Sequence, residues 1–308
     1  MNDKRCVMLI CAFAAALISS PPAIHAQPVP PRLPDGARVV NDAPYVKEGH
    51  ERQVLDLYLP AEGKDWPLVV WVHGGAWRGG NKDRPPALRL LREGYAVASI
   101  NYRLSQHAKF PAQIQDAKAA IRWLRAQAKE YGYDSGRIGV WGASAGGHIV
   151  ALLGTTGDEK EFDVGPNLDQ SSAVQAVIDF FGPTDFLQIQ AQTGDTGRLN
   201  HDAPDSPEAH LLGGPVQENP EKAIRANPIS YVSVDDPPFL IMHGEEDDVV
   251  PIGQSELLHA ALEKAGVPSK LQRIPDAGHG FGGPEIERAV LAFFNRHLQD
   301  TSRGATRR

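Results

Sequence analysis

The stretch RIGVWGASAGGHIVALLG (residues 137–154) joins an apolar, strand-like run to a helix-like run through four small residues and one serine. Around Ser144 it has the pattern G-x-S-x-G. Small neighbours are needed where a serine sits on a sharp strand-to-helix turn at a strained backbone angle, because larger side chains would clash. Close packing of a strand on a helix is the alternative explanation. The strand–turn–helix setting favours a nucleophilic serine.

Strand-like and helix-like runs alternate on both sides of this turn. The strand-like runs occupy 53–60, 67–75, 95–102, 137–142, 173–182, 238–244 and 270–275, and helical spacing covers 110–132, 253–265 and 285–298. Buried strands that alternate with helices predict the α/β class, with a mostly parallel, doubly wound sheet flanked by helices. Functional sites in such sheets lie beyond the carboxyl ends of the strands.

A long polar stretch rich in proline and glycine, from about 155 to 235, interrupts this alternation. It is longer than a simple connection between two elements. Long excursions in compact domains are often lids or binding loops. A surface insertion without such a role is the alternative, and the sequence leaves both open.

A nucleophilic serine needs a base and a carboxylate, and both have candidates downstream. The segment PDAGHGFGG (275–283) places His279 between two glycines, where a histidine has little core to pack against. His148 follows Ser144 on the helix, and packing beneath the site explains it better than a role as base. The acidic run at 245–248 offers four carboxylates, most of them expected to be solvated. Serine, then acid, then histidine is the α/β-hydrolase order and not that of the two common serine proteases.

Acyl transfer also needs donors for an oxyanion. The segment HGGAW (73–77) follows a buried strand, and its glycines allow backbone N–H groups to point into a cavity. The N–H of Ala145 lies on the other side of the serine. Removing one such donor typically costs about 100- to 1,000-fold in rate. No H-E-x-x-H motif or cysteine ligand cluster is present, so neither a metal nor a cofactor is expected.

Five motifs together carry a family resemblance: HGGAW, NYRLSQHAKFPAQIQDAKAAIRWL, GASAGGH, HGEEDDVVP and GHGF. They resemble the α/β-hydrolase carboxylesterases related to hormone-sensitive lipase. The similarity is greatest to the exported bacterial branch grouped with feruloyl and acetyl-xylan esterases, and it spans roughly residues 45–298. It implies the α/β-hydrolase fold and a serine esterase that forms an acyl-enzyme. It also implies that the stretch SPEAHLLGG…NPISYV (residues 206–232) helps to shape the acyl or alcohol pocket.

The resemblance also implies roles for individual residues. The family acid, in an H-G-x-x-D-x-x-V-P pattern, corresponds to Asp247; a proline often follows it, whereas Asp248 stands here and remains an alternative. The oxyanion donors correspond to Gly75, Ala76 and Ala145. Many relatives have a third glycine where this chain has Ala76, but the backbone donor survives that change. Ser144, His279 and Asp247 are thus expected to act in a two-step hydrolysis.

The length, composition and charge of the chain limit its possible partners and its cellular location. The chain has 308 residues, 42% of them apolar, and a net charge of −7 without a long basic run before its last residues, which argues against a nucleic-acid partner. Residues 1–26 have the charged, apolar, small-residue order of a secretory signal, and they contain both cysteines. A Pro-rich lead-in (27–44), a catalytic domain (45–298) and a disordered tail (299–308) are expected to follow. These features predict export to the periplasm or medium, without stable membrane association after cleavage.

The sequence leaves alternatives open for the substrate and for the class of activity. Carboxylic esters of short-chain or aryl acyl groups, on small molecules or polymers, are the leading substrates. A serine exopeptidase is a rival, although such enzymes usually carry a large extra domain that the short lead-in does not provide. An amidase or arylformamidase would use the same residues. A non-catalytic binding protein on this scaffold is less consistent with an intact Ser144 and His279.

Overall fold

The computed structural model describes residues 33–193 and 197–299. The expected signal peptide (1–26), the start of the lead-in (27–32) and the tail from residue 300 lie outside the described residues.

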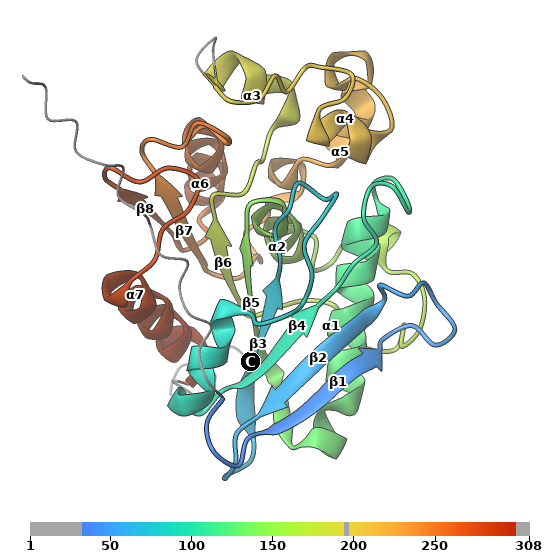
Figure 1. Cartoon of the computed structure of the whole chain (residues 1–308), viewed down its shortest axis with the longest axis vertical. Coiled ribbons are helices and arrows are strands. Elements are labelled where there is room, and N and C mark those ends of the chain that lie inside the picture. Colours follow the sequence, from blue (N-terminus) through green and yellow to red (C-terminus); the bar gives the residue numbers. More distant parts are fainter. Residues whose placement is uncertain (1–32, 194–196, 300–308) are drawn as a thin grey trace, which may run out of the picture.

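An eight-stranded sheet forms the centre of the molecule, in the order β1-β2-β4-β3-β5-β6-β7-β8 (Figure 1). Strands β3 to β8 pair in parallel, whereas β2 runs antiparallel to both β1 and β4. The strands are β1 (Arg38–Pro44), β2 (Val54–Leu59), β3 (Trp66–Val72), β4 (Ala96–Ile100), β5 (Tyr133–Ala143), β6 (Ala176–Phe180), β7 (Phe239–Gly244) and β8 (Ser269–Ile274). The predicted mostly parallel, doubly wound sheet is therefore confirmed.

Helices cover both faces of the sheet because its central strands are apolar on both sides. Strand β3 is buried along its whole length, with alternate residues in two separate cores. One face packs against α1 (Ala112–Tyr131), α2 (Ala145–Thr155) and α6 (Gly253–Ala265). The other packs against a 3₁₀ helix (η1, Pro86–Glu93), α7 (Pro284–Phe294) and the π-helical turn η5 (Asn295–Gln299) that continues it.

The sheet starts earlier than the sequence suggested. Residues of the expected lead-in form β1, which pairs with β2 from Arg38 to Pro44. The backbone there is extended, as expected, but it belongs to the sheet, so the domain begins before residue 45. Most side chains of β1 are exposed or half-buried, which explains why its apolar pattern is weak.

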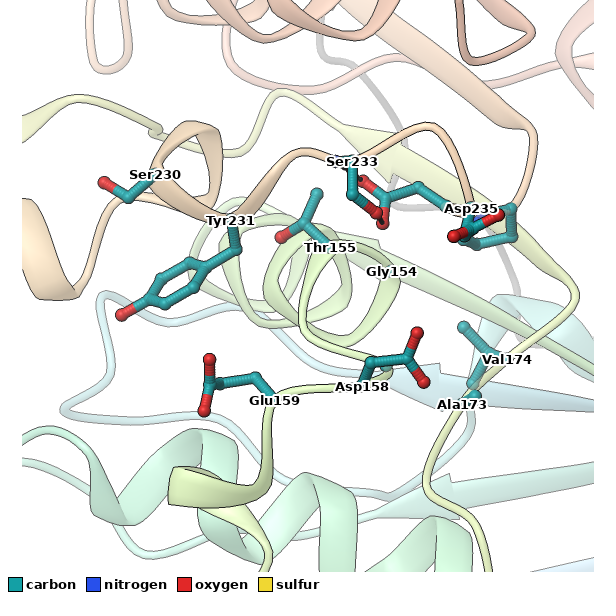
Figure 2. Close-up of a pocket in the computed structure, with 13 residues that line it drawn as sticks. Gly154, Thr155, Asp158, Glu159, Ala173, Val174, Ser230, Tyr231, Ser233 and Asp235 are labelled. Carbon is teal, nitrogen blue, oxygen red and sulfur yellow. Dashed lines mark hydrogen bonds between the residues drawn. The ribbon is translucent and has the colours of Figure 1, made fainter. Parts of the chain in front are cut away.

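The polar stretch 155–235 is two excursions separated by β6, a core strand. The first runs from the end of α2 to the start of β6 and touches the second where Arg225 pairs with Glu161. It borders a cavity of about 460 Å³ (Figure 2), whose lining includes Asp158, Glu159 and Tyr231. The second carries α3 (Phe186–Thr193), α4 (Pro207–Leu212), α5 (Pro220–Arg225) and two 3₁₀ turns, η3 (Val216–Glu218) and η4 (Pro228–Tyr231). Figure 1 shows α3, α4 and α5 above the carboxyl ends of the strands, and we call these three helices and their connections the cap.

Within the described ranges, no helix is long and apolar enough to cross a membrane. The same residues contain no group of three or more histidine, cysteine or acidic side chains placed to hold a metal ion.

Candidate active site

Ser144 occupies the turn between β5 and α2, with φ 56° and ψ −123°. Both motif glycines are required by this turn. A Cβ on Gly142 would lie 2.2 Å from the carbonyl oxygen of Gly146, and a Cβ on Gly146 would lie 2.1 Å from the carbonyl oxygen of Val72. No side chain fits at such distances. The small residues therefore serve the strained serine turn, and close packing of β3 on α2 is part of the same arrangement.

His279 reaches Ser144 from the loop that follows β8. Its Nε2 lies 2.9 Å from Ser144 Oγ, and its Nδ1 lies 2.7 Å from Asp247 Oδ2. The Nδ1–H donates to the carboxylate, which leaves Nε2 to accept from the serine hydroxyl. The imidazole is 21% exposed, so the serine–histidine contact borders solvent while the carboxylate behind it is fully buried.

Asp247 is held by donors on both oxygens. Its Oδ1 accepts the backbone N–H groups of Val249 and Val250, each at 2.9 Å. Its Oδ2 also lies 3.3 Å from His243 Nε2. Burial alone would raise the pKa of Asp247, but the hydrogen bonds from His243 and His279 outweigh burial and hold that pKa well below its ordinary value. Asp247 is therefore a carboxylate at neutral pH.

Asp248, the alternative acid, points elsewhere. Its side chain is 50% exposed and lies 3.9 Å from Arg198. Only Asp247 of the two contacts His279. The geometry thus separates two neighbouring aspartates that the sequence left open.

The segment HGGAW forms a loop against the serine turn. A Cβ on Gly74 would lie 3.2 Å from Ser144 Cβ, so this loop touches the nucleophile's own residue. Gly75 and Ala76 both have positive φ, 109° and 55°. The backbone N–H groups of Gly75, Ala76 and Ala145 donate to no protein acceptor in the part of the chain that the structure describes. These three predicted donors are free to bind a ligand oxygen.

Arg52 holds this loop, and sequence reasoning missed it. Its Nη2 donates to the carbonyl of Gly80 at 2.9 Å and lies 3.1 Å from His73 Nε2. Burial lowers the pKa of His73 to about 4, so its neutral ring can accept from the guanidinium and donate Nδ1–H to the Gly74 carbonyl. Arg52 precedes β2 in a polar stretch, and nothing local in the sequence distinguishes it.

Two further residues support the histidine and the acid. The ring of Phe181 lies 4.7 Å from that of His279, centroid to centroid, and Phe181 itself has a φ of 43°. His243 donates from Nε2 to the Val250 carbonyl at 2.8 Å and accepts from Ser255 at Nδ1. The sequence held one available signal for each: both residues fall at the carboxyl end of a predicted strand.

His148 is a packing residue, as the sequence indicated. It is buried, donates from Nε2 to the Ala226 carbonyl at 2.7 Å, and stands edge-on to Trp77 at 5.3 Å between centroids. Burial lowers its pKa to about 4. Trp77 is itself only 2% exposed and packs in the core.

A serine on a strand–helix turn, linked through a histidine to a buried carboxylate above a mostly parallel sheet, is the arrangement of the α/β-hydrolases. Comparison with known proteins leads to the same class of protein. Residues 55–262 match the BD-FAE family, and the chain belongs to this family of α/β-hydrolase carboxylesterases.

Individual relatives are esterases. The chain is 30% identical to Esterase LipC of Mycobacterium tuberculosis, covering 96% of this chain and 76% of LipC. It is 33% identical to Esterase LipQ of the same organism, over 80% of this chain but 58% of LipQ. Among solved structures, a truncated carbohydrate esterase from gut microbiota has 34% identity and a TM-score of 0.79, over 85% of this chain and 97% of that one. The chain thus spans only part of its curated relatives.

Proposed function

We propose that this protein hydrolyses carboxylic esters through an acyl-enzyme on Ser144. The observation that carries the proposal is the unbroken hydrogen-bonded series from Ser144 Oγ through His279 to Asp247. His279 takes the hydroxyl proton as Oγ attacks the ester carbonyl, and the buried charge of Asp247 stabilises the imidazolium. The imidazolium then returns its proton to the leaving alcohol. A water molecule, activated by the same histidine, releases the acid.

The free N–H groups of Gly75, Ala76 and Ala145 are the proposed oxyanion donors. They flank Ser144 from the β3 loop and from the first residue of α2. The helix of α2 adds the positive end of its dipole to the same place. Donors fixed in advance stabilise the tetrahedral oxyanion without reorganising when the charge develops.

The substrates that we propose are esters of short-chain or aryl acyl groups, borne by a small molecule or a polymer. Phe181 and Phe281, whose rings lie 5.3 Å apart, give an apolar wall beside His279. The likeness to a carbohydrate esterase supports a sugar-linked ester. An amide or peptide substrate would use the same three residues, so activity must be compared directly.

Three substrates, tested side by side on the wild type and on Ser144→Ala, distinguish the alternatives: p-nitrophenyl acetate, methyl ferulate and an aminoacyl p-nitroanilide. We expect turnover of the esters, absent from the variant, with the acetate-to-ferulate ratio reporting the size of the acyl pocket. Turnover of the anilide alone would place the protein among peptidases. If both proteins fold and neither acts on any of the three, the binding-protein alternative replaces the esterase proposal.

We also propose that the protein is exported, because residues 1–26 have the order of a secretory signal. Full-length chain expressed in a Gram-negative host should be recovered from the periplasm or the medium, with its first residue at Gln27. Recovery of the intact chain from the cytoplasm would contradict this proposal.

A further inference from the structure

The cap binds directly to the loop that carries Asp247. The backbone N–H of Arg198 donates to the carbonyl of Asp248 at 2.8 Å. The Nε2 of His201 donates to the carbonyl of Val249 at 3.1 Å. Two successive carbonyls of the acid loop are therefore held by one short segment of the cap.

The peptide groups held in this way are the ones that bind Asp247. The peptide between Asp248 and Val249 accepts from the cap through its oxygen and donates to Asp247 Oδ1 through its N–H. The next peptide, between Val249 and Val250, does the same, with His201 on its oxygen. A carbonyl that accepts a hydrogen bond polarises its peptide, which strengthens donation by the N–H at the other end. Each contact with the cap thus acts on a hydrogen bond to Asp247.

His201 is built for this contact. It is fully buried, as is its partner Glu208 at 2% exposure. Its Nδ1 lies 3.0 Å from Glu208 Oε1, so both ring nitrogens face acceptors and both must donate. Burial alone would lower the pKa of His201, but the hydrogen bond and charge of Glu208 raise it. The ring is fixed further because its own backbone N–H donates to Gln190 of α3.

We propose that His201 is a positioning residue for the reaction: held by Glu208, it fixes the peptide group that donates to Asp247, and so couples the cap to the catalytic carboxylate. This inference rests on the proposed function of Ser144, His279 and Asp247. It also assigns a role to the cap. Its contacts with the acid loop hold the carboxylate in place, in addition to any part that the cap has in shaping the pocket.

The test compares two changes at His201. His201→Phe fills the space but removes both donors, and we expect kcat to fall about tenfold, the effect of one good hydrogen bond, with KM within about twofold. His201→Gln keeps an N–H near the position of Nε2 and should recover most of kcat. His259→Phe, the same change at a histidine of α6 that contacts Ser269 and Glu263, is the matched control and should leave kcat unchanged.

A double-mutant cycle decides whether the effect passes through Asp247. In an Asp247→Asn background, His201→Phe should cost less than about twofold, because the amide side chain no longer carries the charge that the peptide N–H stabilises. The acid limb of the kcat/KM profile should move with His201→Phe in the wild-type background and not with His259→Phe. A full tenfold loss in both backgrounds, or an unchanged kcat in folded His201→Phe, would overturn the proposal.

Two safeguards keep the result interpretable. If His201→Phe does not fold, Glu208→Gln takes its place; it weakens the buried pair and leaves the ring, and a kcat lower by about threefold is expected, again absent with Asp247→Asn. No change of kcat in Glu208→Gln would then count against the proposal. If Asp247→Asn alone leaves kcat intact, it is the proposed function that fails, and this outcome is distinct from a failed cycle.

Discussion

At the scale of single residues, two adjacent aspartates differ entirely in surroundings. Asp247 is buried among four donors, whereas Asp248 is half exposed. Asp247→Asn should lower kcat by roughly 10⁴-fold, because the imidazolium loses its charged partner and the histidine its correct tautomer. Asp248→Asn, the matched control one residue away, should stay within about twofold. Steady-state kinetics on a p-nitrophenyl ester measures both, and similar losses in the two variants would contradict the assignment.

Gly146 sets a steric limit on the same scale. A methyl group at this position meets the carbonyl oxygens of Val72 and His73 at 2.1 and 2.7 Å, and neither belongs to a flexible side chain. We expect Gly146→Ala to lower the free energy of unfolding by roughly 1–3 kcal/mol and to displace Ser144. Gly282→Ala, where a Cβ would meet nothing within 4 Å, is the control. Urea titration with parallel activity measurements tests this; equal stability of the two variants would refute the steric account.

The sequence predicted the residues that carry the chemistry because their motifs are local. Ser144 and His279 can be recognised from the sequence because small residues flank each of them, as a strained turn or a glycine-rich loop requires. Arg52 and His201 cannot be recognised in this way, since each acts through main-chain atoms far away in the sequence: Arg52 on Gly80, His201 on Val249. Contacts between a side chain and a distant carbonyl leave no periodic or compositional trace. The choice between Asp247 and Asp248 likewise needed coordinates.

At the scale of elements, one buried neutral histidine lies directly after β3 and another lies in the first turn of α2. Burial lowers the pKa of His73 and of His148 to about 4. In the unfolded chain these histidines bind protons near pH 6.5, whereas in the folded protein they stay neutral until about pH 4. The stability that they contribute is therefore fully present above pH 6.5 and is lost as the pH falls toward 4. By pH 4 the loss is roughly 3 kcal/mol for each histidine.

Chemical denaturation at pH 7, 6 and 5 measures this loss. His148→Gln keeps a donor for the Ala226 carbonyl but removes the titration, so its stability should fall less steeply over the same range. An equal slope in wild type and variant would show that the acid sensitivity has another source.

The elements themselves followed the sequence where they are buried on both sides or strongly amphipathic. Helix α1 lies within the range that its apolar spacing indicated, and strand β3 overlaps its predicted range but starts one residue earlier. Strand β1 did not stand out, because an edge strand that is mostly open to solvent needs few apolar residues. The short cap helices, six to eight residues long, are stabilised by docking and leave too little periodicity to detect.

At the scale of the whole molecule, the two excursions around β6 have different anchors but touch each other, because Arg225 of α5 pairs with Glu161 of the first excursion. The first is anchored to α1 by a buried cluster of charged side chains. There Asp163 Oδ1 accepts a hydrogen bond from Arg122 Nη1 at 2.7 Å and lies 3.5 Å from Lys118 Nζ. Burial lowers the pKa of Lys118 to about 8, and the charge of Asp163 partly offsets this lowering. The sequence showed one long polar stretch, and only the fold divides it into an anchor and a cap.

Asp163→Asn should therefore lower the free energy of unfolding and leave kcat/KM unchanged. Two buried cations would lose their carboxylate, a change that typically costs about 3–5 kcal/mol. Well below the melting temperature, kcat/KM should be unchanged, since the contacts of Asp163 are with Lys118, Arg122 and Ser172 and not with the three catalytic residues. Asp169→Asn, at an exposed carboxylate in the same excursion, is the control for both readouts. A selective loss of kcat with normal stability would contradict this prediction and show that the cluster acts on the catalytic site.

The central claim is that the acyl group of an ester becomes covalently attached to Ser144 while its alcohol leaves. The most direct measurement is the mass of the protein after brief exposure to a p-nitrophenyl alkylphosphonate, followed by peptide mapping. The account predicts one adduct, on the peptide that contains Ser144, absent from Ser144→Ala and formed far more slowly in His279→Ala. An adduct on another residue, or ester turnover that survives in Ser144→Ala, would contradict it.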